Sequence, residues 1–318
     1  MNLEEGPVQL VQADPDQARE RSRATHEAWG GELTLDSYVA LEARLRAQPW
    51  SCEVLCVWLL CADQGEVLSS CESYRMPSRL GQEEGYSYGI ASVYTEPGKR
   101  RKGYTTELLG RLGARLGAAG RAQAMVLFSD VALRTYQKSG FAPRPALNLA
   151  YPPLPGDPRD GVDQLVPEHQ AAQALAAMPA PGDRFAILPV PAQVDWHLER
   201  ERIFSDVMGL PRPPACGARI GAAGILWAAD PREGELTVLQ LHAPAPAQAH
   251  ALIACARRVA GAAGLARVVC WRTPLDLPGA EAVAEDRLAR LDSVPMILPL
   301  DLRLRAADWN WIPRTLWV

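Results

Sequence analysis

A proline-rich connector at residues 151–158 is the feature that most constrains what this chain can fold into. Its sequence is Tyr-Pro-Pro-Leu-Pro-Gly-Asp-Pro. Proline fixes φ and lacks the backbone N–H that a helix interior or a central strand needs. The chain has 318 residues, enough for about two domains. We therefore expect a first domain over residues 1–151, a linker over 152–164 and a smaller second domain over 165–318.

Composition excludes several classes of protein. Hydrophobic residues make up 48% of the chain and charged residues 22%, which is a globular balance. A net charge of −4 gives no basic face for nucleic acid. Residues 1–6 do not resemble a secretory signal, and the longest apolar run, residues 54–62, is too short to cross a bilayer. We expect neither nucleic acid nor a membrane as a partner, and the sequence leaves an oligomer open.

The cysteines indicate a reducing compartment. Their number is seven, which is odd, and no Cys-x-x-Cys pair occurs. Cys52, Cys56 and Cys61 invite a metal interpretation, but no histidine lies near them and they fall in an apolar segment with the pattern of a strand. We therefore expect buried thiols, no metal and a cytoplasmic location.

The first half alternates strands and helices. Asp14 followed by Pro15 predicts a helix start, because aspartate caps the first turn and proline is favoured at the first helical position. We expect strands at residues 8–13, 52–61, 67–74, 86–94, 124–128 and 141–149, and helices at 15–29, 35–47, 103–117 and 130–139 (the last capped by Asp130).

The second half repeats part of this order. We expect strands at residues 219–229, 236–242, 266–271 and 294–300, and helices at 247–261 and 281–291. The repetition indicates either a duplicated fold or the alternation common to all α/β domains. Both interpretations stay open, and the predicted class is α/β.

The segment of residues 93–109 carries the clearest chemical signal. A strand ends, a short basic loop follows, and a helix begins at Gly103. Free N–H groups at a helix N-terminus bind anions, and a glycine lets the backbone approach the anion closely. Arg100, Arg101 and Lys102 add positive charge. The pattern predicts a site for a pyrophosphate without naming the ligand.

Two motifs give this segment a family resemblance. Arg100-x-x-Gly103-x-Thr105 resembles the acetyl-CoA motif of the GNAT N-acetyltransferases, and residues 129–141, with Tyr136 before Gly-Phe, resemble that family's second motif. The resemblance covers residues 7–150 and implies a mixed central sheet flanked by helices. Thr105 departs from it, since the family usually has glycine or alanine there.

The resemblance also implies a site. Acetyl-CoA is the co-substrate; its pantetheine pairs with the fourth strand and its pyrophosphate takes backbone amides of the basic loop. Tyr136 protonates the leaving thiolate, with a buried packing aromatic as the alternative role. The cofactor-binding residues implied in this way are Ser92, Val93, Tyr94, Arg100, Arg101, Lys102, Gly103, Tyr104 and Thr105.

A narrower resemblance extends over the whole chain. Segments at residues 28–38, 68–72, 93–97, 196–204 and 292–296 are similar to the fungal lysine N6-acetyltransferases of lysine catabolism. It implies that the second domain closes the acceptor site and that the small-molecule acceptor is the ε-amine of free lysine. An aminoglycoside, a polyamine or a protein N-terminus remains an alternative acceptor, as does a coenzyme-A-binding module without catalysis.

Several titratable residues are candidates for the acceptor side. Glu72 is the preferred base or water-orienting carboxylate, with a solvent-facing strand acid as the alternative. His26 and Glu27 border the expected groove, and His197 and His242 are candidates for a cleft between domains. The segment of residues 242–248 has two prolines and no glycine, so the second half should not bind coenzyme A.

The last ten residues are rich in tryptophan. Trp309, Trp311 and Trp317 precede Val318. Some multidomain acetyltransferases use a terminal carboxylate as base, but we favour an aromatic anchor that docks the tail.

Overall fold

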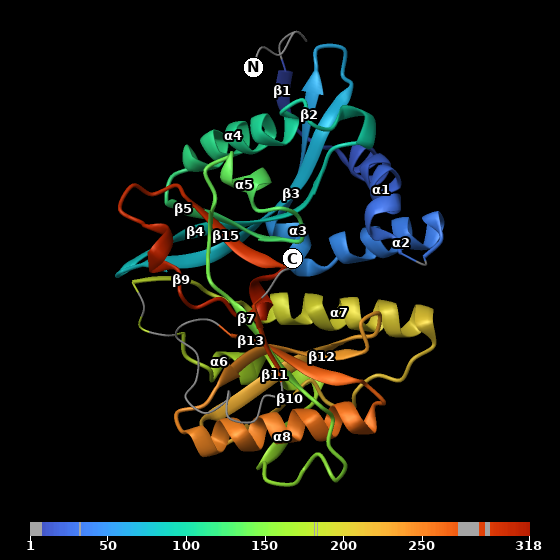
Figure 1. The fold of residues 1–318 in the computed structure, drawn as a ribbon, viewed down its shortest axis with the longest axis vertical. Helices are drawn as coiled ribbons and strands as arrows, with labels where there is room; N and C mark the ends of the chain where they lie inside the picture. The colour runs from blue at the N-terminus through green and yellow to red at the C-terminus, as the bar shows by residue number, and fades with distance from the viewer. Residues whose placement is uncertain (1–7, 32, 181, 183, 273–285, 290–292) are drawn as a thin grey trace. The chain divides into compact units, whose positions relative to one another are not determined.

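The computed structural model describes residues 8–31, 33–180, 182, 184–272, 286–289 and 293–318. The chain forms two compact units, each built from non-contiguous segments (Figure 1). The first comprises Met1–Arg144, Asp292–Asp308 and Val318, and the second Pro145–Leu291 and Trp309–Trp317. Both are mixed α/β structures, so the predicted α/β class is confirmed.

A mixed sheet forms the centre of the first unit. Its strand order is β1-β2-β3-β4-β5-β15-β6, and every neighbouring pair is antiparallel except β4 and β5, which run parallel. The strands are β1 (Val8–Gln12), β2 (Leu55–Ala62), β3 (Val67–Leu80), β4 (Glu83–Tyr94), β5 (Ala122–Ser129), β6 (Ala142–Pro143) and β15 (Val294–Pro299). The helices are α1 (Pro15–Trp29), α2 (Leu35–Arg46), α3 (Pro49–Val54), α4 (Tyr104–Gly117) and α5 (Arg134–Gln137), with a 3₁₀ turn at η1 (Pro97–Lys99).

Local sequence explains the two helices that border the site. The Asp14 side chain accepts a hydrogen bond from the Gln17 backbone N–H, and the Asp14 backbone N–H donates to Gln17 Oε1; the two bonds form a capping box at the start of α1. In α4, Leu108, Leu109 and Leu112 are fully buried against the sheet, because they lie on one face of the helix.

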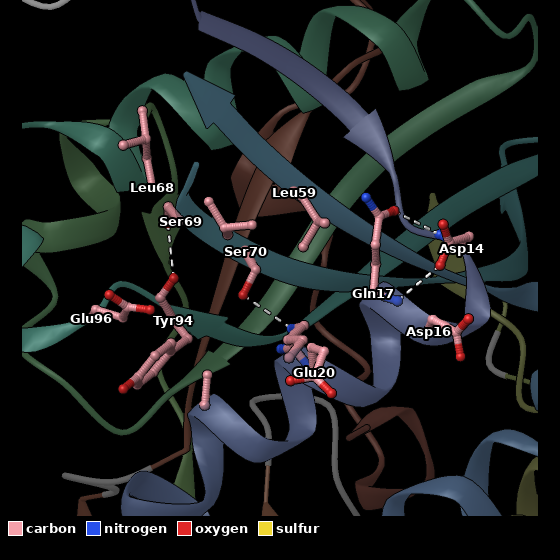
Figure 2. Close-up of a pocket in the computed structure, with 13 residues that line it drawn as sticks. Asp14, Asp16, Gln17, Glu20, Leu59, Leu68, Ser69, Ser70, Tyr94 and Glu96 are labelled. Atoms are coloured by element: carbon pink, nitrogen blue, oxygen red, sulfur yellow. Dashed lines mark hydrogen bonds between the residues drawn. The ribbon is translucent and has the colours of Figure 1, made fainter. Parts of the chain in front are cut away.

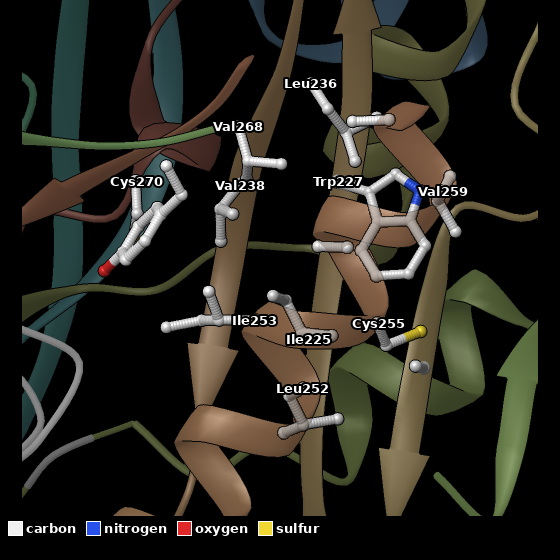
Figure 3. Packing of buried hydrophobic residues seen from close by; sticks show 14 of the residues in the cluster. Ile225, Trp227, Leu236, Val238, Leu252, Ile253, Cys255, Val259, Val268 and Cys270 are labelled. Carbon is white, nitrogen blue, oxygen red and sulfur yellow. The ribbon is translucent and has the colours of Figure 1, made fainter. Parts of the chain in front are cut away.

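The second unit has its own sheet, with the order β14-β7-β13-β12-β11-β10-β8. Helix α8 packs on it, and Trp227 is fully buried among Leu252, Cys255 and Val259 (Figure 3). The strands of this sheet are β7 (Leu147–Tyr151), β8 (Gln164–Val166), β10 (Gly217–Ile220), β11 (Ala223–Asp230), β12 (Glu235–His242), β13 (Arg267–Arg272) and β14 (Asp286–Ala289); the short strand β9 (Phe185–Ile187) belongs to the unit but not to this sheet. The helices are α6 (Ala171–Ala176), α7 (Pro191–Met208) and α8 (Pro246–Ala262), with 3₁₀ turns at η2 (Glu168–Gln170), η4 (Ala306–Asp308, in the first unit) and η5 (Arg314–Leu316).

Two strands lie in a different sheet from the one expected. The expected strand over residues 141–149 is divided at residues 144–146, which include Pro145, into β6, in the first sheet, and β7, which pairs with β13 in the second. The expected strand over 294–300 exists as β15, but it pairs with β5 and completes the first sheet. The observed division therefore differs from a simple separation at residues 152–164.

Other expectations are corrected locally. Residues 52–54 belong to α3, and Cys52 is exposed rather than buried. Helix α5 is only four residues long, and Asp130 does not cap it; its carboxylate instead accepts hydrogen bonds from the backbone N–H and hydroxyl of Ser293.

In the second half, residues 219–229 form the hairpin of β10 and β11 rather than one strand. Of the expected helix over 281–291, the described part is strand β14, and the remainder lies outside the described residues, as do residues 1–6. Helix α7 was not predicted. None of the helices in the described part of the chain has the length and apolar character needed to span a membrane.

Candidate functional site

Strand β4 carries a bulge opposite β3. Ser70 pairs with Tyr94 and Glu72 pairs with Ala91, so β4 has one more residue than β3 over this interval. Ser92 takes up the extra length in a left-handed conformation, with φ of 50°. Such a bulge re-aims the backbone groups that follow it.

Beyond the bulge, β4 separates from β5. The parallel pairing ends at Ile90 and Leu127, so among the described residues the backbone of residues 91–94 has no partner on the β5 side. An extended ligand that carries amides can pair with such an exposed strand edge. Ser92, Val93 and Tyr94, the residues predicted for the pantetheine, lie on this segment and are half-buried.

The start of α4 follows directly on the chain. Gly103 is its N-cap and has φ of 93°, a conformation that favours glycine. A glycine cap has no side chain to occupy the free N–H groups of the first turn, so those groups are available to an anion. Tyr104 is 2% exposed and packs in the core, so only its backbone can contribute.

The loop before Gly103 is basic and solvent-accessible. Arg100, Arg101 and Lys102 are all exposed, and Arg100 Nε donates to the Thr95 carbonyl at 2.9 Å. Lys99 forms salt bridges with Glu66 and Glu96. The positive charge that surrounds the helix start thus comes from the three predicted residues.

Thr105 is accommodated by a chain of hydroxyl groups. Its Oγ1 lies 3.1 Å from Thr95 Oγ1, which lies 2.8 Å from Ser69 Oγ, and Ser69 donates to the Tyr94 carbonyl. The side chain that departs from the family pattern is therefore held against the end of β4.

Tyr136 is buried beside the α4 core. It is 9% exposed and contacts Phe141 edge to face. Burial, together with the nearby Asp130 and Cys71, raises the pKa of Tyr136 to about 12. The phenol is protonated at neutral pH and so can donate a proton or hydrogen bond.

Glu72 is not solvent-facing. It is 4% exposed, and its Oε1 accepts from Arg21 Nη1 and Arg46 Nη2, each at 3.0 Å. Burial alone would raise the pKa of Glu72, but the two guanidinium groups outweigh burial and hold the pKa below its usual value. Tyr74 donates to Oε2 at 3.3 Å. A carboxylate held in this way is a weak proton acceptor.

A cavity beside α1 was not predicted from the sequence. Its volume is about 460 Å³, and Tyr94 at the end of β4 forms part of its wall (Figure 2). Four carboxylates and one guanidinium line it, and Leu59 and Leu68 contribute apolar surface. The charged residues are Asp14, Asp16, Glu20, Glu96 and Arg21. The acidic positions on α1 share one side of the helix, which is the pattern that could have indicated them.

The predicted histidines do not join this site. His26 bonds the Leu33 carbonyl through Nε2 at 2.7 Å and so fixes the turn between α1 and α2, and Glu27 is exposed. His197, in the second unit, donates from Nε2 to the Thr315 carbonyl at 3.0 Å, and burial lowers its pKa to about 3. His242 is half-buried in β12.

The tryptophan-rich tail is largely buried. Trp309 is 0% exposed and Trp311 9%, as expected for an aromatic anchor, and Arg314 lies 3.9 Å from the Trp317 ring centroid. Val318 belongs to the first unit, and its side chain packs close to Gly89 of β4. A Cβ added at Gly89 would lie 3.2 Å from Val318 Cγ2.

Within the described ranges, no group of three or more His, Cys, Asp or Glu side chains is placed to hold a metal ion. All seven cysteines are free; Cys56 is half-buried and Cys61 buried.

Comparison with known proteins identifies the fold. Residues 166–298 match the family model described as the LYC1 GNAT-like C-terminal domain. No relative is found among curated proteins. Similar solved structures include a GCN5-related N-acetyltransferase from Kribbella flavida (15% identity, 93% of this chain and 72% of that chain, TM-score 0.56). Another is a GCN5-related N-acetyltransferase from Anabaena variabilis (12% identity, 93% of this chain and 74% of that chain, TM-score 0.59). A third is Eis1 from Mycobacterium abscessus (15% identity, 93% of this chain and 74% of that chain, TM-score 0.57).

The sheet, its bulge and these matches define a protein with the GNAT fold, so the fold implied by the sequence resemblance is confirmed. More particularly, the second half contains a GNAT-like domain similar to that of the LYC1 family, which is consistent with the narrower resemblance seen in the sequence.

Proposed function

We propose that this protein is an acetyl-CoA-dependent N-acetyltransferase that acetylates a primary amine by direct attack. One observation carries the proposal: β4 turns away from β5 at a left-handed bulge, and the next helix starts at a left-handed glycine within a basic loop. The first feature offers backbone pairing to an amide-containing chain, and the second offers N–H groups to a pyrophosphate. Acetyl-CoA contains both.

The residues of the first unit divide the work. Residues 92–94 pair with the pantetheine, and the backbone of residues 103–105, with Arg100, Arg101 and Lys102 around it, holds the pyrophosphate. The acceptor nitrogen attacks the thioester carbonyl, the C–S bond breaks, and the thiolate takes a proton from the Tyr136 hydroxyl. The acceptor's own proton leaves to water, since Glu72 is too weak a base.

Free lysine is the proposed acceptor. The support is the narrower sequence resemblance together with the LYC1-type domain. The ε-amine of lysine has a solution pKa near 10.4, so the bound amine must lose a proton before it attacks. A polyamine or aminoglycoside is the second candidate, because the cavity that reaches Tyr94 is lined by four carboxylates and one guanidinium.

The test is a panel of acceptors. Full-length protein is incubated with acetyl-CoA and, separately, L-lysine, spermidine, an aminoglycoside and a peptide with a free N-terminus. Thiol release gives the rate, and mass spectrometry locates the acetyl group. N6-acetyllysine as the preferred product supports the proposal. Preference for spermidine or the aminoglycoside replaces the acceptor but keeps the reaction. Binding of acetyl-CoA without thiol release from any amine leaves a coenzyme-A-binding module.

The cytoplasmic location is part of the proposal. Its support is the seven free cysteines, which a reducing compartment would preserve.

A further inference from the structure

Arg21 joins three strand positions from a single helix residue. It lies in the middle of α1 and is 6% exposed. Its Nε donates to Ser70 Oγ at 3.1 Å, and its Nη1 donates to Glu72 at 3.0 Å. Its Nη2 donates to the Ser92 carbonyl at 2.5 Å. A planar guanidinium with fixed donors can hold three acceptors in one geometry, as a flexible ammonium cannot.

The third of these contacts falls on the bulge itself. Ser92 has φ of 50°, which residues other than glycine rarely adopt. The sequence does not favour that conformation, so the surrounding structure must impose it. The bond from Arg21 is charge-assisted and partly buried, and it acts on the carbonyl of the strained residue.

Glu72 and Arg46 complete the arrangement and supply a control. Arg46 donates to the same Glu72 Oε1 at 3.0 Å, and also to Ser22 and Glu42. Glu42 and Glu72 together balance the two guanidinium charges. None of these Arg46 contacts reaches Ser92, so Arg46 shares the ion pair of Arg21 but not its contact with the bulge.

We infer that Arg21 is a positioning residue for acetyl transfer: through the Ser92 carbonyl it holds the β4 bulge in the shape that presents residues 92–94 to the thioester. The inference rests on the proposed function. It assigns Glu72 the task of fixing the Arg21 guanidinium, in place of proton transfer. It also explains why a buried ion pair connects α1 to the strand beside the proposed pantetheine site.

The experiment compares Arg21→Gln with Arg46→Gln in the full-length protein. We expect Arg21→Gln to lower kcat about 10-fold to 100-fold, because small misplacements of reacting groups cost up to about 100-fold. We expect Arg46→Gln to stay within about threefold of the wild type, even where both variants lower Tm equally. Equal losses of kcat in the two variants would overturn the inference, since the ion pair alone would then matter.

A milder variant guards against misfolding of Arg21→Gln. Ser70→Ala removes only the acceptor for Arg21 Nε, and we expect a smaller kcat loss in the same direction. Amide hydrogen exchange at Val93 and Tyr94 gives a readout without activity. Faster exchange in Arg21→Gln but not in Arg46→Gln supports the inference even if no amine is acetylated, whereas unchanged exchange in Arg21→Gln contradicts it.

Discussion

The two units contain the same local arrangement with different contents. In each, an antiparallel strand pair is followed by a helix and then a strand parallel to the second of the pair: β3, β4, α4 and β5 in the first unit, and β11, β12, α8 and β13 in the second. Each second strand has one extra residue. In the second unit the neighbouring β11 residues Leu226 and Trp227 pair with Gln240 and Val238 of β12, so Leu239 is the additional residue.

The bulges are held by different partners. Arg21 donates to the Ser92 carbonyl in the first unit, and Thr315 Oγ1 donates to the Leu239 carbonyl at 2.8 Å in the second. Thr315 belongs to η5, a tail segment that lies against β12. The chain's own tail thus contacts the second bulge, whereas the first is held from the α1 side.

The helix starts differ as well. Helix α4 begins at a left-handed glycine after three basic residues, whereas α8 begins at Ala245 and Pro246, with φ of −126° at Ala245. Proline has no N–H to donate to an anion. The second unit thus repeats the strand arrangement without the phosphate-binding helix start, so we expect one acetyl-CoA site per chain.

The largest expected effect concerns the acid. Tyr136→Phe keeps the ring but removes the hydroxyl, and general acid catalysis contributes about 10²–10⁴-fold, so kcat should fall by about that factor while acetyl-CoA affinity is unchanged. Tyr38→Phe is the matched control, because burial also raises the pKa of Tyr38 to about 12.

Since the pKa of Tyr136 is about 12, the wild-type kcat should show no loss from deprotonation of Tyr136 between about pH 7 and 10. Near-normal turnover of Tyr136→Phe, with chemistry rate-limiting, would make Tyr136 a packing residue.

The second prediction tests the site that only the first unit should have. Gly103→Glu forces a side chain onto φ of 93° and adds a negative charge beside the expected pyrophosphate. Left-handed strain lowers the stability of the free and the bound protein alike, by about 1–2 kcal/mol. The affinity falls because the carboxylate repels the pyrophosphate and its side chain blocks the free N–H groups, and about 1.4 kcal/mol of such loss is tenfold in Kd. Titration calorimetry should show one site in the wild type and a Kd raised more than about tenfold in the variant.

Gly110→Glu is the control for that variant, since it adds the same charge to an exposed position of α4 where a Cβ meets nothing within 4 Å. Two equivalent sites in the wild type would refute the distinction between the units.

A third prediction compares two buried carboxyl groups, one in each unit. Glu72 has a lowered pKa because two guanidinium groups face it, so Glu72→Gln should lower the free energy of unfolding by about 3–5 kcal/mol at pH 7. Burial raises the pKa of Glu201 to about 7, against the weaker opposing effect of its bond from the Ala229 N–H.

The pH dependence of Glu201 has a definite sign. A carboxyl group with a raised folded-state pKa favours folding fully below its unfolded pKa, about 4.5, and this contribution is lost as the pH rises to about 7. The wild type should therefore lose up to about 3 kcal/mol relative to Glu201→Gln over this window. Chemical denaturation at pH 4.5 and 7.5 measures it, and a pH-independent difference would contradict the prediction.

The smallest effect is expected at the second bulge. Thr315→Val keeps the shape but leaves the Leu239 carbonyl without this donor, which should cost about 1 kcal/mol of unfolding free energy. Thr237→Val, on the same strand, is the comparison variant. Acetyl-CoA affinity should be unchanged in both; a gain of a second acetyl-CoA site in Thr315→Val would show that the tail, and not the helix start, excludes the ligand.

Local signals in the sequence located much of the proposed site. The Asp14–Pro15 cap, Gly103 and Tyr136 each depend on neighbours within a few residues, and all lie in the elements expected of them. The environment of Glu72 could not be found in this way, because Arg21 and Arg46 are distant in sequence and reach it only through the fold.

Helix α7 was not predicted because its sequence lacks the usual amphipathic pattern. Its buried positions include Gln193, His197, Glu199 and Glu201, so no apolar stripe at helical spacing identifies it. The sheets to which β7 and β15 belong could not be predicted either, because periodicity identifies a strand but not the strand with which it pairs.

The position of β15 has a consequence for biosynthesis. Val294 pairs with Ser129 and Pro299 with Ala124, so the first sheet cannot be completed until nearly the whole chain has left the ribosome. Until then β5 has an open edge containing Val126 and Leu127, a template for pairing with other nascent chains. A fragment ending within residues 152–164 would keep that edge permanently, so its aggregation would report on the missing strand rather than on a loss of acceptor binding.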